Sequence, residues 1–562
     1  MAALLAFGSP AVAQVDAGAR ADRQARGLIE ERLRPDPRRE IEQGRPVFGE
    51  DARQPAEEDE GPSFLIRSIE TNPTEVLSPE AVRAIVGPYE NRTLSVGDIR
   101  RLVDRIDAAY RAARFKAGFA IVPDQDLTTG VLHIVLVEPR VDQITASGLN
   151  RVRPDYIASR IPLHSGGLFD LNGLENSLNL MNRMSPGAMH VEALLQPGRA
   201  FGTTSLDVRV HEAAPFELVT VVDNYGSRET GRYRPVSVAR FANPLGIDDL
   251  LQIGVSGAIN DAGDPGSYSG FFSYSVPVSD LTRLNLSASI SRSNIDDGAF
   301  AALDLTTRSD YLAGSLRRPF LSTERWLVAG EFGGEVSISQ TKTGPLLINR
   351  RIREMFAQVD ATYYGDDAGL QASLKLAGFD AKIADNAGAS SDHFVALSGG
   401  LFGYRRVGRF EARLRGNWQW SPYDLLPASK QFALGGPYSV RGYQIDQFSG
   451  DSGFYLGVEG RVSLLDPGHA DNRFVGALNL VGFADGGGVF PFRADGTTPR
   501  REDFATSIGL GLEASLFSDY LTVFAGLAQP LDKVHRALHG NDPRFLFQAA
   551  LRVPFHGEQV AQ

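Results

Sequence analysis

The stretch FEARLRGNWQW, residues 410–420, alternates between apolar or small side chains and polar or charged ones. A period of two is typical of a β-strand, whose successive side chains point to opposite faces. The run FYLGVEGRVSL, residues 454–464, alternates in the same way. One apolar face and one charged face fit the wall of a membrane barrel, with lipid outside and water inside. The residues predicted to line the lumen are Glu411, Arg413, Arg415, Glu459 and Arg461.

Between these two strands lies a long connection that contains GGPYSVRGY, residues 435–443. It is too long for a tight hairpin turn, it is rich in glycine, and it carries one arginine, Arg441. Binding and catalytic residues are often carried on loops that a rigid scaffold positions. The sequence therefore predicts a functional loop here.

The same alternation continues through the chain beyond Pro215, for example in residues 284–291 and 508–516. Roughly 340 residues at ~20 per strand and connection predict about sixteen antiparallel strands. A barrel of that size has a water-filled lumen. A soluble β-sandwich also alternates, but the polar faces here are rich in Ser, Asn, Gly and Arg in strand after strand, which favours the barrel. The aromatic run that ends at Phe555 is typical of a closing strand.

Composition excludes several classes of function. The 562 residues include no Cys, so no disulfide frame, thiolate metal site or cysteine nucleophile is available. The formal charge of -11 is spread along the chain, and no basic patch of the kind that nucleic acid requires is present. The sequence contains no Walker-type glycine loop, HExxH or GxSxG motif. We therefore expect no catalytic residues, no metal and no cofactor.

The N-terminal residues read as an export signal that lacks its basic start, with a small-x-small cleavage pattern before Gln14. We expect a signal peptide at residues 1–13, followed by a short polar helix from Ala17 to about Arg34. A proline-rich, charged linker is expected up to residue 62. At the other end, residues 556–562 extend past the last predicted strand.

Two similar modules are predicted between the linker and the barrel, at residues 63–139 and 140–213. The first has a strand at 64–70, a helix capped by Ser78, a helix from Ser95 to about Lys116 with Ser95 and Asp98 as a capping box, and strands at 119–122 and 131–138. The second repeats this order, with strands at 141–146, 189–195 and 204–211 and helices near 154–161 and 170–184. Repetition of a ~75-residue unit indicates tandem domains of one kind. Each has three strands, so an edge is open to strand addition by a partner peptide.

These features together resemble an outer-membrane transporter of two-partner secretion, the TpsB group within the superfamily that includes the BamA insertases. The resemblance extends over nearly the whole chain. Residues Val440, Arg441, Gly442 and Tyr443 match the VRGY/VRGF motif of the sixth extracellular loop, which in this family folds back into the barrel. Residues Gly482, Phe483, Asp485 and Gly486 resemble the F-x-D-x-G motif on a later strand of the same wall. The two modules resemble POTRA domains, and the early helix resembles the plug helix of this group.

The resemblance implies a membrane all-β barrel of about sixteen strands at residues 214–555, preceded by two small α+β POTRA domains and an N-terminal helix. It implies export of a large, β-helical partner exoprotein from the periplasm to the cell surface without nucleotide hydrolysis. Outer-membrane lipid and the barrel assembly machinery are the other partners it implies. Position along the strand also places Asp485 on the lumen side, and we expect it to pair with Arg441.

Two other functions remain open from the sequence. An insertase-like assembly factor would share the superfamily, but its longer POTRA array is absent and a plug-like helix counts against it. A plain diffusion porin would have no reason for two periplasmic modules.

Overall fold

The computed structural model describes residues 23, 24, 27, 36–47, 62–227, 229–260, 263–295, 304–385, 388–465, 475–493, 496, 499–517, 519–532 and 542–555. The expected signal peptide, the C-terminal extension and most of the expected helix at 17–34 lie outside these residues. The rest forms two compact units, a barrel and a pair of small domains. No helix in the described ranges is both long and apolar enough to cross a membrane.

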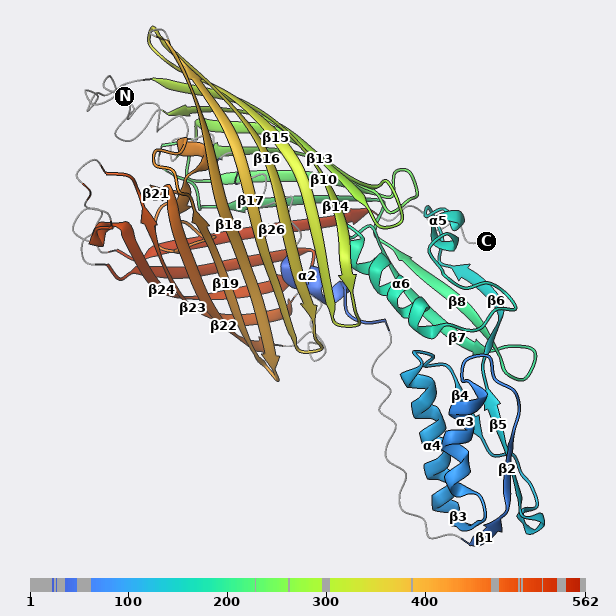
Figure 1. Ribbon diagram of the computed structural model, residues 1–562. Coiled ribbons are helices and arrows are strands. Elements are labelled where there is room, and N and C mark those ends of the chain that lie inside the picture. The colour runs from blue at the N-terminus through green and yellow to red at the C-terminus, as the bar shows by residue number, and fades with distance from the viewer. Residues whose placement is uncertain are drawn as a thin grey trace. The chain divides into compact units, whose positions relative to one another are not determined.

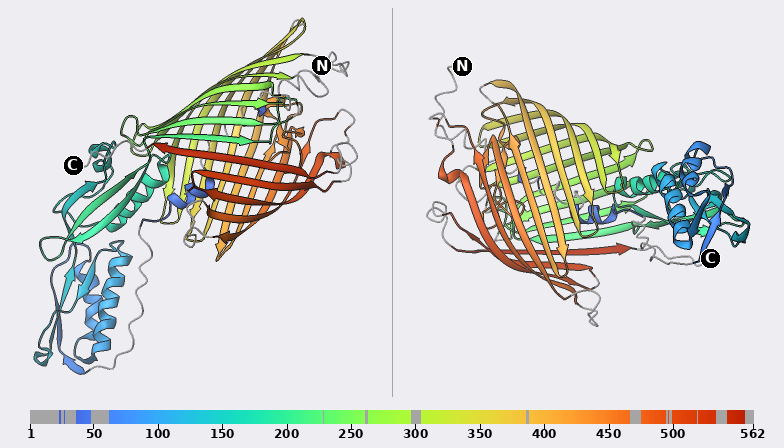
Figure 2. Two further views of the ribbon diagram at one scale, coloured as in Figure 1. Left: turned by 180° about the vertical axis from the view of Figure 1, so that it is seen from behind. Right: turned by 60° about the horizontal axis from the view of Figure 1, so that its bottom comes forward.

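Sixteen of the described strands close into one antiparallel barrel, as predicted (Figures 1 and 2). Each pairs with its neighbour along the chain, and β26 closes the ring on β9 through pairs from Gln548↔Asp223 to Phe555↔Phe216. The strands are β9 (Phe216–Asp223), β10 (Arg234–Ala242), β11 (Leu250–Ile259), β12 (Pro265–Pro277), β13 (Arg283–Ile295), β14 (Leu305–Ser322), β15 (Trp326–Thr343), β16 (Leu346–Tyr364), β17 (Ala368–Ala384), β18 (Ala389–Val407), β19 (Phe410–Trp420), β22 (Ser452–Leu465), β23 (Val475–Phe490), β24 (Phe504–Leu516), β25 (Leu521–Pro530) and β26 (Arg544–Phe555).

The side chains of the wall lie on the predicted faces. Phe410 and Trp420 are 63% and 55% exposed on the outside of β19. Glu411, which belongs to the other set of alternating positions, is buried on the inside. The same contrast holds in β22, where Leu456 is exposed and Tyr455 is buried. An apolar outer face suits the hydrocarbon core of the membrane, and the polar inner face suits a hydrated lumen.

The first small domain differs from the prediction in its first strand. The expected strand at 64–70 is split at Arg67 into β1 (Ser63–Ile66) and β2 (Ser68–Thr71). The split follows from pairing: β1 pairs with β3 (Arg92–Ser95), which was not predicted, and β2 pairs with β5 (Val131–Val137). The other elements are α3 (Pro79–Val86), η1 (Gly87–Tyr89), α4 (Val96–Ala112), β4 (Phe119–Ile121) and η2 (Leu127–Thr129).

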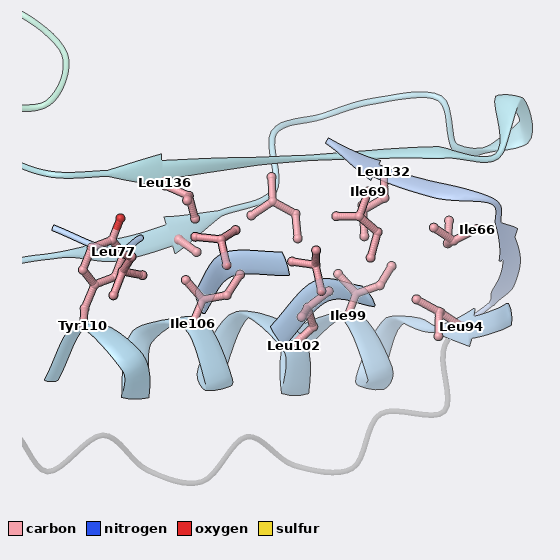
Figure 3. Packing of buried hydrophobic residues seen from close by; sticks show 14 of the residues in the cluster. Ile66, Ile69, Leu77, Leu94, Ile99, Leu102, Ile106, Tyr110, Leu132 and Leu136 are labelled. Atoms are coloured by element: carbon pink, nitrogen blue, oxygen red, sulfur yellow. The ribbon is translucent and has the colours of Figure 1, made fainter. Parts of the chain in front are cut away.

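Helix α4 begins at the predicted cap and packs its apolar stripe on the sheet. The hydroxyl of Ser95 accepts the backbone N–H of Asp98, and the carboxylate of Asp98 accepts the N–H of Ser95. Figure 3 shows Leu102 and Ile106 of this helix facing Leu132 and Leu136 of the sheet, and all four are buried. The helix ends at Ala112, earlier than predicted, and Arg114 just beyond it has a left-handed backbone with φ of 58°.

The second small domain repeats this order with β6 (Arg140–Ser147), α5 (Pro154–Ala158), α6 (Leu171–Met184), β7 (Met189–Pro197) and β8 (Thr203–Glu212). Its sheet has the order β6-β8-β7, and the larger sheet of the first domain has the order β2-β5-β4. The repeat extends to one detail. Glu138, just after β5, accepts the backbone N–H groups of residues 75 and 76, and Glu212, at the end of β8, accepts those of residues 150–152.

The first domain should lose stability as the pH falls below about 4.5. Hydrogen bonds from Ser95 and then Arg101 lower the pKa of Asp98 to about 2. Burial raises the pKa of Glu138, but hydrogen bonds from Thr74 and the amides of residues 75 and 76 outweigh it and lower that pKa. Because both carboxyl groups have a lower pKa in the folded state than in the unfolded state, their contribution is present above their ordinary pKa range and is lost as they protonate.

Hydrogen exchange of the full chain in detergent, read on peptides from residues 63–139, measures this loss. We expect Ser95→Ala to lower the free energy of local unfolding by about 1 kcal/mol at neutral pH. It should also make the pH dependence shallower, because the hydroxyl of Ser95 no longer donates to the carboxylate of Asp98 and the pKa of Asp98 is lowered by less in the folded state. A pH dependence equal to that of the unaltered chain would contradict this account of Asp98.

Candidate functional site

The connection between β19 and β22, residues 421–451, packs inside the barrel. It contains η4 (Ala428–Lys430) and a small hairpin of β20 (Phe432–Leu434) and β21 (Phe448–Gly450), which lies against β22 and β23. Its apolar residues form a buried cluster with inward-facing residues of the wall: Leu434, Val440, Tyr443, Tyr455, Val489 and Ala505. The motif residues Val440 and Tyr443 are therefore part of a luminal core.

Arg441 lies at the centre of this packing and binds two carboxylates. Its guanidinium donates from Nε to Asp485 Oδ2 at 2.7 Å and from Nη2 to Asp485 Oδ1 at 2.9 Å. The third nitrogen, Nη1, donates to Glu459 Oε2 at 2.7 Å. All three side chains are buried. The predicted pair is present, and Glu459, expected only to line the lumen, is a second partner.

The neighbouring motif residues hold the arginine in place. The ring of Phe483 lies 3.6 Å from the guanidinium carbon of Arg441, a cation–π contact. Tyr443 donates to the backbone oxygen of Thr506 at 3.1 Å, and its own carbonyl accepts from Arg544 at 2.7 Å. Gly442 has a backbone φ of 97°, which residues with a side chain rarely adopt. These contacts fasten the loop to β23, β24 and β26.

The two glycines of the strand motif play no part in this cluster. Gly482 and Gly486 alternate with the inward-facing Phe483 and Asp485, so they lie on the outer side of the wall. A Cβ atom added at either position would meet its nearest neighbour at 3.8 Å or 3.6 Å, an ordinary contact. Their place in the site therefore remains a prediction from the resemblance.

The charged residues predicted to line the lumen pair with one another. Arg413 donates to Glu411 at 2.5 Å, and Arg461 donates to Glu459 at 2.7 Å. Arg461 also binds both oxygens of Glu513, at 2.6 Å and 3.0 Å. Arg415 lies 4.0 Å from Glu459. Most of the charge of these side chains is therefore neutralised within the network.

A second part of the loop is fastened to another sector of the barrel. Lys430 forms ion pairs with Glu335 of β15 and Glu354 of β16, and Lys375 of β17 binds Glu354 at 2.6 Å. In the strand order these strands are well separated from β22 and β23, where Arg441 binds. The loop is thus tied to the wall at two sites. This second site was not predicted from the sequence, although the alternation in β15 and β16 places Glu335 and Glu354 on the inner face.

Helix α2 (Pro37–Gln43) lies in the lumen against β16 and β17, in a stretch that we predicted to be linker (Figure 1). Arg38 lies 3.3 Å from Glu411, and Glu42 accepts a hydrogen bond from Arg406 at 3.2 Å. Ile41 is fully buried, and a Cβ atom at Gly369 would lie only 2.6 Å from it. The linker prediction is wrong here because the proline and charges, read as signs of flexibility, form a capped helix with partners in the wall.

Two described residues of the expected plug-type helix contact the long loop and the connection between β9 and β10. Arg23 lies 3.0 Å from Asp446 of the long loop, and Gln24 accepts a hydrogen bond from Thr230 at 3.0 Å. These two residues therefore link the N-terminal segment to the long loop.

Comparison with known proteins agrees with this architecture. Residues 64–139 match the model of the POTRA domain of ShlB type, and residues 202–318 and 395–513 match that of the haemolysin secretion/activation protein ShlB/FhaC/HecB. The chain belongs to this family of outer-membrane transporters. The two matches together cover more than half of the sequence and extend from the first small domain to strand β24.

Several relatives of this two-partner secretion transporter match over most of their length. The outer membrane transporter CdiB of Escherichia coli is 25% identical, over 86% of this chain and 82% of that protein. The solved structure of CdiB from Escherichia coli has a TM-score of 0.71 at 21% identity and covers 98% of this chain and 100% of that one. BamA from Haemophilus ducreyi, solved without POTRA domains 1–3, has a TM-score of 0.50 at 11% identity, covering 87% and 100%.

The family and the fold place the protein in the outer membrane, with its POTRA domains in the periplasm, as a pore that translocates a partner protein.

Proposed function

We propose that the POTRA domains recognise a secreted exoprotein in the periplasm by adding one of its strands to an open sheet edge. The observation that carries this proposal is strand β7, which among the described strands pairs with β8 alone. The side chain of Asn182 binds the backbone N–H and C=O of Val191, so the candidate edge is the part of β7 beyond Val191. An unpaired edge offers a row of N–H and C=O groups that bind an extended peptide without demanding a particular sequence.

The barrel then passes the exoprotein to the cell surface without nucleotide hydrolysis. The absence of a Walker-type glycine loop from the sequence supports this. We further propose that Arg441, Asp485 and Glu459 hold the long loop in its working position during transport. The exoprotein is large and β-helical in this proposal, and the transporter itself reaches the membrane through the barrel assembly machinery.

Hydrogen exchange tests the edge-strand proposal on the full chain in detergent. Adding an N-terminal fragment of the exoprotein encoded beside this transporter should protect amides of β7 (Met189–Pro197) that lie beyond Val191, because the new strand gives them hydrogen-bond partners. Amides of β8, already paired on both sides, should change little. Protection confined to the helices α4 and α6 would contradict strand addition.

An insertase-like role is the second candidate, since the fold is shared with BamA. It predicts that depleting this protein lowers the levels of several unrelated outer-membrane barrels. A secretion transporter predicts loss of one exoprotein with the other barrels unchanged.

A further inference from the structure

The outer face of β13–β17 changes from apolar to basic toward one end of the strands. In β16, for example, Met355 is 62% exposed, and the next outward positions are Arg353 and Arg351. The chain enters the barrel at Phe216, directly after the periplasmic POTRA unit, so β9 runs from the periplasmic side to the extracellular side. Each later strand runs in the opposite direction to the one before it, because the barrel is antiparallel. By this order the basic ends of β13–β17 are extracellular.

Six cationic side chains make up this feature, which we call the extracellular cationic band. Each lies in one of these five strands, is exposed, and in most cases stands between two buried inward-facing residues. The members are Arg292, Arg308, Lys342, Arg351, Arg353 and Lys382. Two carboxylates share the face: Asp310 lies 3.5 Å from Arg308, and Asp380 lies 3.4 Å from His393.

The band is confined to one side of the barrel. Among the described strands, the outward positions of β9–β12, β19 and β22–β26 carry no Lys or Arg, and the two other outward arginines, Arg318 and Arg405, lie near the periplasmic ends of β14 and β18. General solubility would not require so uneven a distribution.

Within the band, two pairs of like charges stand directly opposite each other, whereas Arg353 stands opposite Asp380. Arg292 is the cross-strand partner of Arg308, and Arg351 is the partner of Lys382. Directly opposed like charges destabilise a sheet, because their Cβ atoms are only about 5 Å apart. The lumen shows how such a pair is relieved: Glu335 and Glu354 are also cross-strand partners, and Lys430 binds both.

We propose that the extracellular cationic band binds the phosphate groups of the phosphorylated glycolipid that forms the outer leaflet. A phosphate anion between two opposed cations would relieve their repulsion, as the ammonium group of Lys430 does for Glu335 and Glu354. The height also fits. At about 3.4 Å per residue, Arg353 and Arg351 lie ~7 Å and ~14 Å along the strand beyond the last exposed apolar side chain, where the headgroups begin.

Two double variants separate this proposal from general electrostatics. Arg351→Gln with Lys382→Gln removes one opposed pair, and Arg318→Gln with Arg405→Gln removes two outward charges at the other membrane face. Binding of bisphosphorylated lipid A to the full chain in detergent can be measured by native mass spectrometry at a fixed ionic strength. We expect binding roughly 10-fold weaker for the first variant and a change of less than about twofold for the second.

Equal losses in the two variants, or no loss in either, would overturn the proposal. So would equal binding of lipid A that lacks its phosphates, or of phosphatidylglycerol, since the assigned ligand is the phosphorylated glycolipid. Displacement of lipid A by millimolar inorganic phosphate alone would also contradict a lipid site.

A readout without ligand checks the electrostatic argument. In lipid-free detergent, Arg351→Gln with Lys382→Gln should unfold at the same or a higher temperature than the unaltered chain, because the opposed charges are gone. Added lipid A should raise the unfolding temperature of the unaltered chain more than that of this variant. A lower unfolding temperature for the variant in the absence of lipid would mean that the pair does not repel, against the proposal.

Discussion

Arg441→Lys is expected to reduce secretion of the partner exoprotein nearly as much as Arg441→Ala, although the positive charge remains. The guanidinium of Arg441 makes two hydrogen bonds to Asp485, one to Glu459 and a face contact with Phe483. An ammonium group is a compact charge without this planar fork. It cannot make the two parallel hydrogen bonds to Asp485, and it loses the flat contact with Phe483.

The size of the effect follows from burial. Removing one partner of a buried ion pair costs about 3–5 kcal/mol, because the remaining charge is left in a poorly solvated site. In this cluster we expect the cost to destabilise the docked position of the loop. The equilibrium between the docked and undocked loop should then shift toward the undocked one by roughly a hundredfold or more. We therefore expect secretion to fall by at least about tenfold for either substitution.

Secretion can be followed as exoprotein in the culture medium, with heat-dependent migration on SDS gels as the check that the barrel is assembled. Arg415→Lys is the matched control, since the nearest nitrogen of Arg415 lies 4.0 Å from Glu459 and makes no bidentate contact with it. Asp485→Ala should resemble Arg441→Ala, and the double variant should be little worse than either single one. Normal secretion by Arg441→Lys, or simple addition of the two alanine effects, would show that the loop works through other contacts.

Deleting residues 17–43 should raise the single-channel conductance of the purified protein in planar bilayers severalfold. A barrel of sixteen strands has an aqueous lumen when nothing fills it. Helix α2 lies in that lumen and is held by Glu411, Arg406 and the wall around Gly369. The shorter deletion of residues 17–34 should also raise the conductance, but by less, because α2 stays in place.

The control keeps the chain length and breaks the contacts. Arg38→Gln with Glu42→Gln removes the ion pairs of α2 with Glu411 and Arg406. We expect frequent transitions between a low and a high conductance in this variant, since the helix remains tethered but is less firmly bound. If removing residues 17–43 left the conductance unchanged, α2 would not obstruct the pore.

Much of the barrel followed from local pattern. In Phe410–Trp420 the alternation alone assigned Glu411 to the lumen and Trp420 to the lipid, because side chains of a strand point to opposite faces whatever the strand packs against. The same reasoning placed Asp485 on the inner face. Helix α4 was equally local, since its cap at Ser95 and Asp98 depends on residues three apart in the sequence.

Errors arose where a distant partner decided the outcome. The first POTRA strand is split because β1 and β2 pair with strands on different sides, which the seven residues from Phe64 to Glu70 do not encode. Pro37–Gln43 looked like linker by composition. It is a helix whose buried residue, Ile41, packs on a glycine in β17.

By itself, the sequence determined the class of fold, the two faces of the wall and the repeated small domains, and the resemblance of its motifs indicated that Arg441 meets Asp485. Only the tertiary structure decided which charges meet inside the lumen: Glu459 as the second partner of Arg441, Glu513 as the partner of Arg461, and Lys430 between Glu335 and Glu354. The physical reason is that alternation sets the face of each residue but not its height or its neighbour around the barrel. Those depend on strand register and on how the long loop folds back, which are set by contacts between residues far apart in the chain.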